Sequence, residues 1–327
     1  MKRINPFKSV YDICDNGDIE YKANNVPVFA RYIDIEVTNN CNYKCLMCPV
    51  GTGSINRKQG FMNEYVYDKI LNEIKEYKTP LRFIRWGEPT LHMNFIEYIK
   101  IAKDLGIICH FNTNGSLFSK KQFNEIVDIE LDSIKFSFQG VDKKSYSEMR
   151  NTDYFSELLD KIKMLYDIRG DKAYPYIHVS TTITYETEEQ VKKFKKEVEK
   201  YADLVTVGRT ILDYIDLNRV KLEEKDKNMI IRLKGEESVI KQHPKCCPEV
   251  FDKLSINWDG SVSACCGDYD NKMIIGNIKD NTLLEIWNSN KMNSYRKILS
   301  EKRYDELELC KVCYDYMELQ ASGLQNV

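Results

Sequence analysis

Three cysteines, Cys41, Cys45 and Cys48, stand within eight residues in the stretch TNNCNYKCLMCPVG. A structural zinc site is closed by four nitrogen or sulfur ligands. No fourth cysteine stands nearby, and nothing local favours His110 as the missing ligand. An iron–sulfur cluster held by three thiolates instead leaves one iron open to a substrate or cofactor. The spacing therefore favours a cluster with a vacant coordination position over a closed zinc site or three packed thiols.

Six more cysteines follow residue 209 and provide a second set of soft ligands. They are Cys246, Cys247, Cys265, Cys266, Cys310 and Cys313. The last two form a Cys-x2-Cys turn that can chelate a metal. The pair Asp259-Gly260 predicts a hairpin between two alternating runs, with position 265 on its outgoing arm. Ligands from 247, 265, 310 and 313 would close a [4Fe–4S] cluster or, equally, a structural zinc site.

The two doublets leave alternatives in this second set. Cys246 is the alternative to Cys247, and Cys266 is the alternative to Cys265. The Gly-x4-Cys spacing favours Cys265.

Strand-like runs alternate with amphipathic segments between residues 33 and 209. We predict strands at 33–37, 81–86, 107–112, 133–138, 176–183 and 204–208, and helices at 64–77, 94–105, 120–129, 155–168 and 187–201. This alternation is typical of parallel strands joined by right-handed crossovers. The fold is therefore predicted to be α/β, a partial (β/α)6 TIM-like barrel or an open sheet. Chemistry is expected at the carboxyl ends of the strands.

The pattern changes after Arg209, where a charged stretch leads to the hairpin, a helical segment at 282–299 and the last cysteine pair. We predict an N-terminal extension at 1–30, a partial barrel at 31–215 and a small hairpin-plus-helix cluster-binding domain at 216–327.

Length and composition describe an ordinary globular chain. With 327 residues, two domains are expected. The net charge of −2 gives no reason to expect a nucleic-acid or membrane partner. No signal-like or membrane-spanning run is present, so we expect a cytoplasmic protein. Eleven cysteines in that compartment favour metal binding over disulfides. Cys14 and Cys109 are interpreted as free packing thiols.

The segment CNYKCLMC resembles the Cys-x3-Cys-x2-Cys motif of the radical S-adenosylmethionine (radical SAM) superfamily. Three further segments resemble the family at the ends of successive predicted strands: RWGEP at 85–89, FNTNG at 111–115 and FSFQG at 136–140. The resemblance extends over about residues 30–210.

This resemblance implies cofactors and roles. A [4Fe–4S] cluster on the three cysteines would chelate the methionine moiety of S-adenosylmethionine, whose cleavage gives a 5′-deoxyadenosyl radical. Glu88 would accept a hydrogen bond from the methionine ammonium, Ser137 and Gln139 would bind ribose or carboxylate, and Arg150 could pair with the carboxylate. The cofactor-contacting positions are Met47, Gly87, Glu88, Pro89, Asn112, Asn114, Ser137, Gln139 and Arg150.

Two positions depart from the family pattern. Met47 stands where an aromatic residue commonly packs near the adenine, and methionine makes that apolar contact more loosely. Trp86 replaces the first glycine of the Gly-Gly-Glu-Pro motif, so its ring is expected to form a cavity wall or pack against the next strand.

The C-terminal segment resembles the SPASM/twitch extension of the same superfamily. DGSVSACC, MIIGNIKDNTLLEIWNSNKM and the final Cys-x2-Cys carry the likeness. It implies one auxiliary [4Fe–4S] cluster on Cys247, Cys265, Cys310 and Cys313. An electron donor such as flavodoxin or ferredoxin is implied as a partner.

Two reaction classes follow from this layout. The auxiliary cluster could accept an electron while a small sugar, nucleotide-linked sugar or aminocyclitol alcohol is oxidised to a ketone, as in the family's aminocyclitol dehydrogenases. Alternatively, the enzyme could modify peptide side chains; sugar epimerisation is a further alternative. Only 40 residues precede Cys41, which favours the small hydroxylated substrate. A non-enzymatic metal protein is the remaining hypothesis. Arg85, His110 and Arg209 are the candidate catalytic residues, each with a structural role as the alternative.

Overall fold

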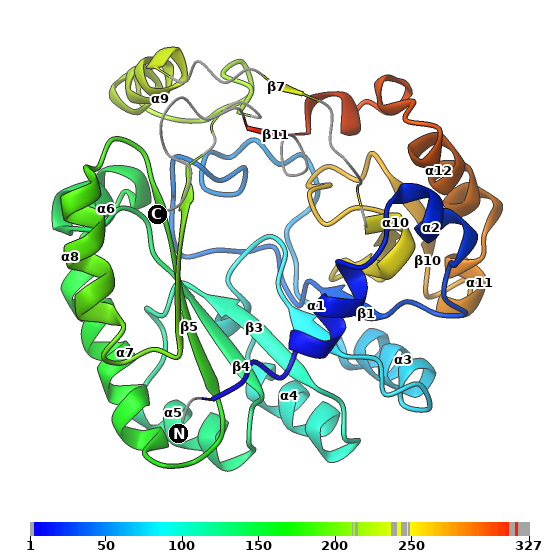
Figure 1. Ribbon diagram of the computed structural model, residues 1–327, viewed down its shortest axis with the longest axis horizontal. Helices are drawn as coiled ribbons and strands as arrows, with labels where there is room; N and C mark the ends of the chain where they lie inside the picture. Colours follow the sequence, from blue (N-terminus) through cyan, green and yellow to red (C-terminus); the bar gives the residue numbers. More distant parts are fainter. Residues whose placement is uncertain are drawn as a thin grey trace.

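The computed structural model describes residues 3–210, 212, 215–236, 241–242, 247, 249–313 and 318–319. Its centre is a curved sheet that contains six parallel strands in chain order (Figure 1). They are β1 (Tyr32–Ile35), β2 (Leu81–Phe83), β3 (Cys109–Thr113), β4 (Ser133–Ser137), β5 (Tyr176–Ile183) and β6 (Leu204–Arg209). Among the described residues, β6 ends the sheet on one side and β10 on the other, so the sheet is not closed. The predicted α/β partial barrel is confirmed.

Helices between the strands cover the convex face of the sheet (Figure 1). They are α3 (Glu64–Ile74), α4 (Phe95–Asp104), α5 (Lys120–Asp128), α6 (Lys143–Arg150), α7 (Phe155–Arg169) and α8 (Glu188–Val198). In α3 the side chain of Asn63 caps the first turn, and Val66, Ile70 and Ile74 recur at helical spacing and are buried. The short helix α6 was not predicted, because its sequence KKSYSEMR is mostly polar and only Tyr146 and Met149 give it an apolar face.

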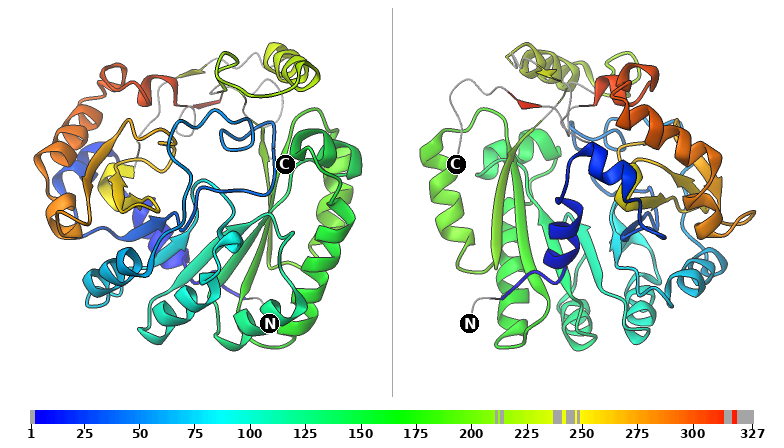
Figure 2. Two further views of the ribbon diagram at one scale, coloured as in Figure 1. Left: turned by 180° about the vertical axis from the view of Figure 1, so that it is seen from behind. Right: turned by 45° about the vertical axis from the view of Figure 1, so that its right-hand side comes forward.

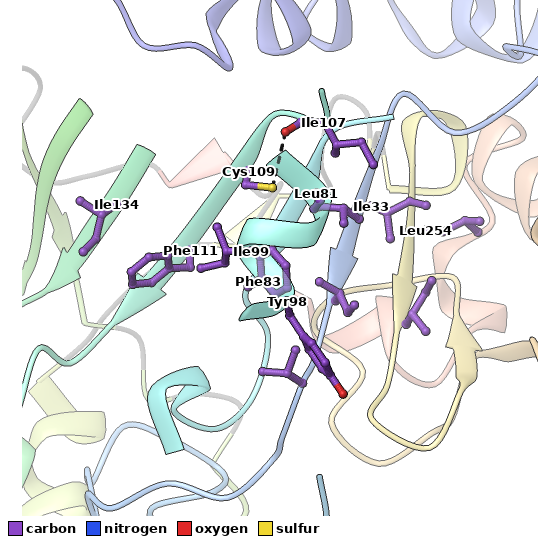
Figure 3. Close-up of a cluster of buried hydrophobic side chains, with 14 of the residues drawn as sticks. Ile33, Leu81, Phe83, Tyr98, Ile99, Ile107, Cys109, Phe111, Ile134 and Leu254 are labelled. Carbon is purple, nitrogen blue, oxygen red and sulfur yellow. Dashed lines mark hydrogen bonds between the residues drawn. The ribbon is translucent and has the colours of Figure 1, made fainter. Parts of the chain in front are cut away.

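The strands divide their side chains between two faces because successive residues point to opposite sides. Phe83, Phe111 and Ile134 belong to the apolar core between sheet and helices (Figure 3). Residues of the other set, such as Arg82, His110 and Lys135, lie on the concave face. The concave face of this sheet is therefore polar, unlike the packed apolar centre of many barrels.

Two unpredicted N-terminal helices, α1 (Lys8–Cys14) and α2 (Ile19–Asn24), complete this part of the fold. Figure 2 shows α1, in blue, along the inner side of the curved sheet. There the ring of Phe7 packs against His110 with 5.8 Å between ring centroids, and the Tyr11 hydroxyl accepts a hydrogen bond from Arg82 at 3.1 Å. Helix α1 thus covers the polar face below the carboxyl ends of the strands.

The C-terminal region extends the same sheet. Strand β8 (Lys253–Ile256) pairs with β1 in parallel, β9 (Ser261–Ser263) returns from it as the predicted hairpin, and β10 (Ile274–Asn277) pairs with β9. Gly260 has φ +86° in the hairpin turn, a conformation that favours glycine. The sheet crosses the boundary expected near residue 216, and the division into separate domains stays a prediction.

The segment at 282–299, predicted as one helix, is two. α11 (Leu283–Trp287) ends before Ser289, whose side chain caps the start of α12 (Asn290–Ser300). The remaining elements are α9 (Glu224–Glu236), α10 (Glu249–Asp252), the paired strands β7 (Lys241–Gln242) and β11 (Glu318–Leu319), and the 3-10 turns η1 (Pro89–Leu91), η2 (Tyr304–Glu306) and η3 (Cys310–Val312). None of the helices in the described part of the chain is long and apolar enough to cross a bilayer.

Candidate functional site

A cavity of about 310 Å³ opens at the carboxyl ends of β2 to β5. It brings together most of the site residues predicted from the sequence: Cys41, Cys45, Met47, Cys48, Arg85, Gly87, Glu88, Asn112, Asn114, Ser137 and Arg150. Pro89, Gln139, His110 and Arg209 are not among its lining residues. Lys135, Ser180 and Thr182 also line it, and sequence reasoning missed them.

The three-cysteine loop follows β1 and forms one wall of the cavity. The Cys48 amide donates to the Cys45 carbonyl at 3.2 Å, which closes a turn between the two thiols. Gly51 allows the chain to pass, since a Cβ there would lie 2.3 Å from the Cys45 carbonyl oxygen. Burial raises the pKa of the Cys41 thiol to about 12 and that of Cys48 to about 11, so a bound metal centre must displace these protons.

This loop suits an iron–sulfur cluster in its donor chemistry. It presents thiols alone, which are the ligands of such clusters. Within the described residues, no three His, Cys, Asp or Glu side chains form a group that could hold a single metal ion. The guanidinium of Arg150 lies beside the loop, with its Nη1 donating to the Cys45 sulfur at 3.5 Å. Its buried Nε has no hydrogen-bond partner in the described part of the chain, so a donor remains available to a bound group.

Glu88 fixes the loops at the ends of β2 and β3. Its carboxylate accepts hydrogen bonds from the Thr90 and Thr113 hydroxyls, at 2.6 and 2.8 Å, and from the Asn114 amide at 2.7 Å. Burial raises the pKa of Glu88, and these hydrogen bonds act in the opposite direction. Gly87, with φ +94°, precedes it; a Cβ there would lie 2.4 Å from the Thr38 carbonyl oxygen. Any role of Glu88 toward a methionine ammonium stays a prediction.

The side chains of Ser137 and Gln139, at the carboxyl end of β4, have different environments. The Ser137 carbonyl accepts a hydrogen bond from Arg150, and its side chain faces the cavity. Gln139 is fully buried, and its amide is engaged by Thr210 at 2.6 Å and Thr182 at 2.5 Å. Gln139 thus joins the ends of β5 and β6 and does not reach the cavity.

The candidate catalytic residues occupy three different settings. Arg85 lines the cavity, whereas Arg209 lies exposed at the end of β6. His110 is buried, with Nδ1 bonded to the Ser133 hydroxyl at 3.0 Å and Nε2 to Asn112 Oδ1 at 2.8 Å. Burial, with the nearby cations, lowers the pKa of His110 to about 3, so the ring is neutral and serves as a structural hydrogen-bonding group.

Five described cysteines surround a second, smaller cavity of about 30 Å³. They are Cys247, Cys265, Cys266, Cys310 and Cys313. All four predicted ligands are therefore close together, and this all-thiol set again suits an iron–sulfur cluster. Cys266 lines the cavity as Cys265 does, so that alternative stays open, and Cys246 lies outside the described residues. Cys14 and Cys109 are buried and free, away from both sites.

Arg85 and Trp86 connect the two cavities. The Arg85 guanidinium donates to the backbone carbonyls of Cys265 at 3.2 Å and Asp268 at 3.0 Å. Trp86 forms part of the first cavity's wall, as expected, and its ring meets that of Tyr269 edge-on at 5.7 Å. The backbone of Arg85 has φ 109°, which is costly for a residue with a side chain. The loop that carries Cys265 is thus held directly against the first cavity.

An α/β half-barrel with a three-cysteine loop at its strand ends and a thiol-lined C-terminal site defines a class of iron–sulfur proteins. Comparison with known families agrees: residues 35–198 match the Radical SAM superfamily, and residues 246–314 match SPASM, an iron–sulfur cluster-binding domain. The chain belongs to the radical SAM superfamily. It binds S-adenosylmethionine and a [4Fe–4S] cluster, with an auxiliary iron–sulfur cluster in the SPASM region.

Individual relatives are distant. The S-adenosyl-L-methionine-dependent 2-deoxy-scyllo-inosamine dehydrogenase of Niallia circulans is 22% identical over 86% of this chain and 91% of its own length. The crystal structure of BtrN in complex with AdoMet and 2-DOIA aligns with a TM-score of 0.57 at 17% identity, covering 88% of this chain and 94% of BtrN. Streptococcus suis SuiB bound to precursor peptide SuiA aligns with a TM-score of 0.64 at 16% identity, covering 90% and 73%. These likenesses support the fold.

Proposed function

We propose that this radical SAM oxidoreductase oxidises a secondary alcohol of a small hydroxylated substrate to a ketone. The observation that carries the proposal is the contact between the two sites. Arg85 lines the first cavity and also holds the carbonyls of Cys265 and Asp268. An electron acceptor bound at Cys265 would lie behind a wall one side chain thick. The sequence likeness to an inosamine dehydrogenase supports the same reaction type.

Conversion of an alcohol to a ketone removes one hydrogen atom from carbon, one proton from oxygen and one electron. When bound, the cofactors supply a 5′-deoxyadenosyl radical as the hydrogen acceptor and an auxiliary cluster as the electron acceptor. The chain supplies the geometry. Glu88 fixes the loops after β2 and β3, Arg150 holds the loop of Cys45 against β4, and Met47 and Trp86 add apolar wall to the cavity. The hydroxyl proton leaves to water.

The test is a single-turnover reaction of anaerobically reconstituted enzyme with reductant, S-adenosylmethionine and a panel of polyols deuterated at their carbinol carbons, with peptides as a second panel. We expect deuterium in 5′-deoxyadenosine and one equivalent of ketone from a polyol. Flavodoxin or ferredoxin, the proposed donor, can be compared with a chemical reductant in the same assay.

A matched variant separates the two clusters. Replacing Cys310 and Cys313 by alanine is expected to keep the first cluster's spectrum and the deuterium transfer but to lower ketone yield at least tenfold. Deuterium transfer from peptides alone, or a polyol epimer in place of a ketone, would contradict the proposed oxidation and favour the corresponding alternative.

A further inference from the structure

Lys135 places a positive charge inside the first cavity. In β4 it alternates with Ile134 and Phe136, which are buried in the apolar core, so Lys135 faces the concave side. It lines the cavity beside Ser137. Within the described part of the chain, its ammonium has no hydrogen-bond or ion-pair partner.

The neighbours of Lys135 on the adjacent strands are already engaged and carry no charge. Asn112 of β3 and His178 of β5 stand beside it in register. The Asn112 side-chain oxygen is bonded to His110 at 2.8 Å, and His178 Nε2 to the Thr206 hydroxyl at 2.8 Å. Burial lowers the pKa of His178 to about 4, so it is neutral near pH 7.

The carboxylates near Lys135 are engaged by other groups. Asp34, the carboxylate that acts on it, accepts hydrogen bonds from Nε and Nη2 of the Arg82 guanidinium and lies 3.2 Å from the Lys253 ammonium. Glu88, on the cavity wall, accepts hydrogen bonds from three neighbouring residues. Lys135 is therefore a cation whose counter-charge the described residues do not supply.

The other unsatisfied groups around the cavity are also donors. Trp86 Nε1, Arg85 Nε and Arg150 Nε are buried and have no hydrogen-bond partner among the described residues. The hydroxyl of Ser180 stands on the neighbouring strand in register with Ser137. A cavity rich in donors, with an uncompensated ammonium, is complementary to an anionic ligand because a buried cation is costly unless it is paired.

We propose that Lys135 binds an anionic group of the substrate, a carboxylate or a phosphate ester, so that the substrate is an acidic sugar or polyol. This inference rests on the proposed oxidation of a hydroxylated compound and narrows its substrate class. An amine-bearing cyclitol would bring a second positive charge against Lys135. The two anionic groups share one chemistry, a negatively charged oxygen acceptor for the ammonium.

Binding is tested without turnover, by anaerobic equilibrium dialysis of the reconstituted enzyme with S-adenosylmethionine and no reductant. The probes are D-glucuronate, D-glucose 6-phosphate, D-glucose and D-glucosamine. We expect an anionic probe to bind roughly 10- to 100-fold more tightly than D-glucose, the range of a charge-assisted contact. D-glucosamine should bind most weakly. The ratio between the two anionic probes distinguishes carboxylate from phosphate.

Three variants make the result specific. Lys135→Met should bring the anionic probes to the affinity of D-glucose, Lys135→Arg should retain most of the preference, and Lys193→Met, an exposed lysine of α8, should leave it unchanged. Affinity of the parent enzyme for the anion should fall as pH rises from 7 to 9.5, and Lys135→Arg should remove that fall. Iron content and the absorption spectrum of each variant establish that it is folded and loaded.

The proposal is overturned if neither anionic probe binds, if D-glucosamine binds as well as they do, or if Lys135→Met weakens S-adenosylmethionine and leaves the anions unaffected. Because dialysis needs no radical chemistry, failure of the alcohol oxidation would leave this binding result intact, and the two proposals fail separately.

Discussion

Replacing Lys135 by methionine should stabilise the protein at neutral pH. The lysine is enclosed by the concave face of the sheet, and its pKa is lowered from 10.5 to about 8, first by burial and then by Arg82, with Asp34 acting in the opposite direction. Methionine has a similar length and brings no charge. The substitution therefore removes the cost of placing an ammonium there, and no hydrogen bond recorded for the described residues is lost with it.

The size of the stabilisation follows from the lowered pKa of Lys135. Lowering the pKa from 10.5 to about 8 corresponds to about 3 kcal/mol of free energy of unfolding. Below pH 8 lysine is charged in both the folded and unfolded states, so the full cost is present. Between pH 8 and 10.5 the unfolded chain binds more protons than the folded chain, and the cost declines. At pH 9.5 about two fifths of it remains.

Thermal unfolding of the reconstituted protein, loaded with both clusters and kept anaerobic, measures the difference. With about 2.1 cal/mol/K of unfolding entropy per residue, Lys135→Met should raise the Tm by about 5 °C at pH 7 and about 2 °C at pH 9.5. Unfolding of such a protein is often irreversible, so both proteins are heated at one scan rate. Lys193→Met, at an exposed position, should change neither value.

Two results would refute the reasoning. A lower Tm for Lys135→Met at pH 7 would show that the ammonium is stabilised by a partner. A difference that does not change between pH 7 and 9.5 would show that the lysine charge is not its cause, and that the methionine acts by packing.

Two further predictions address the buried charges of the fold. Lys253→Met removes the cation that bridges Glu249 at 2.6 Å and Asp34 at 3.2 Å, and should lower stability by about 3–5 kcal/mol at pH 7. Thermal scans at pH 7 measure the loss, and a Tm equal to that of the parent protein argues against it. His110→Asn should cost about 1–3 kcal/mol of stability through its two hydrogen bonds. Because His110 is neutral above its pKa of about 3, the pH–rate profile of His110→Asn from pH 5.5 to 8 should have the same shape as that of the parent enzyme. If the parent profile falls toward acid pH and the variant's does not, His110 is a catalytic base.

The sequence predicted the frame of the molecule well because its periodicities are strong. All six parallel strands overlap their predicted ranges, and the residues of the strand-end motifs, such as Cys41, Glu88 and Asn114, meet at one cavity. Parallel strands present their carboxyl ends on one side, so motifs at those ends converge whatever the details of the loops. The hairpin at Asp259-Gly260 was equally local and is confirmed.

What could not be predicted depends on contacts between distant segments. The pairing of β8 with β1 and the insertion of Phe7 beside His110 have no local signal. Gln139 stands next to cavity residues in sequence, yet its amide is used by Thr182 and Thr210. Lys135 was missed although a local signal existed, since a lysine that alternates with Ile134 and Phe136 in a buried strand indicates a polar inner face.

The buried charged residues of the concave face differ in whether they are paired. Arg82, Asp34, Lys253 and Glu249 form one buried chain of alternating sign that runs from the strands toward the auxiliary cavity, which Glu249 lines. In that chain each cation contacts a carboxylate, and the chain is neutral as a whole. Lys135 lies outside it: the charge of Arg82 lowers the pKa of Lys135, and no carboxylate of the described residues forms an ion pair with it. The surplus positive charge therefore stands in the first cavity, where we propose that an anionic substrate neutralises it.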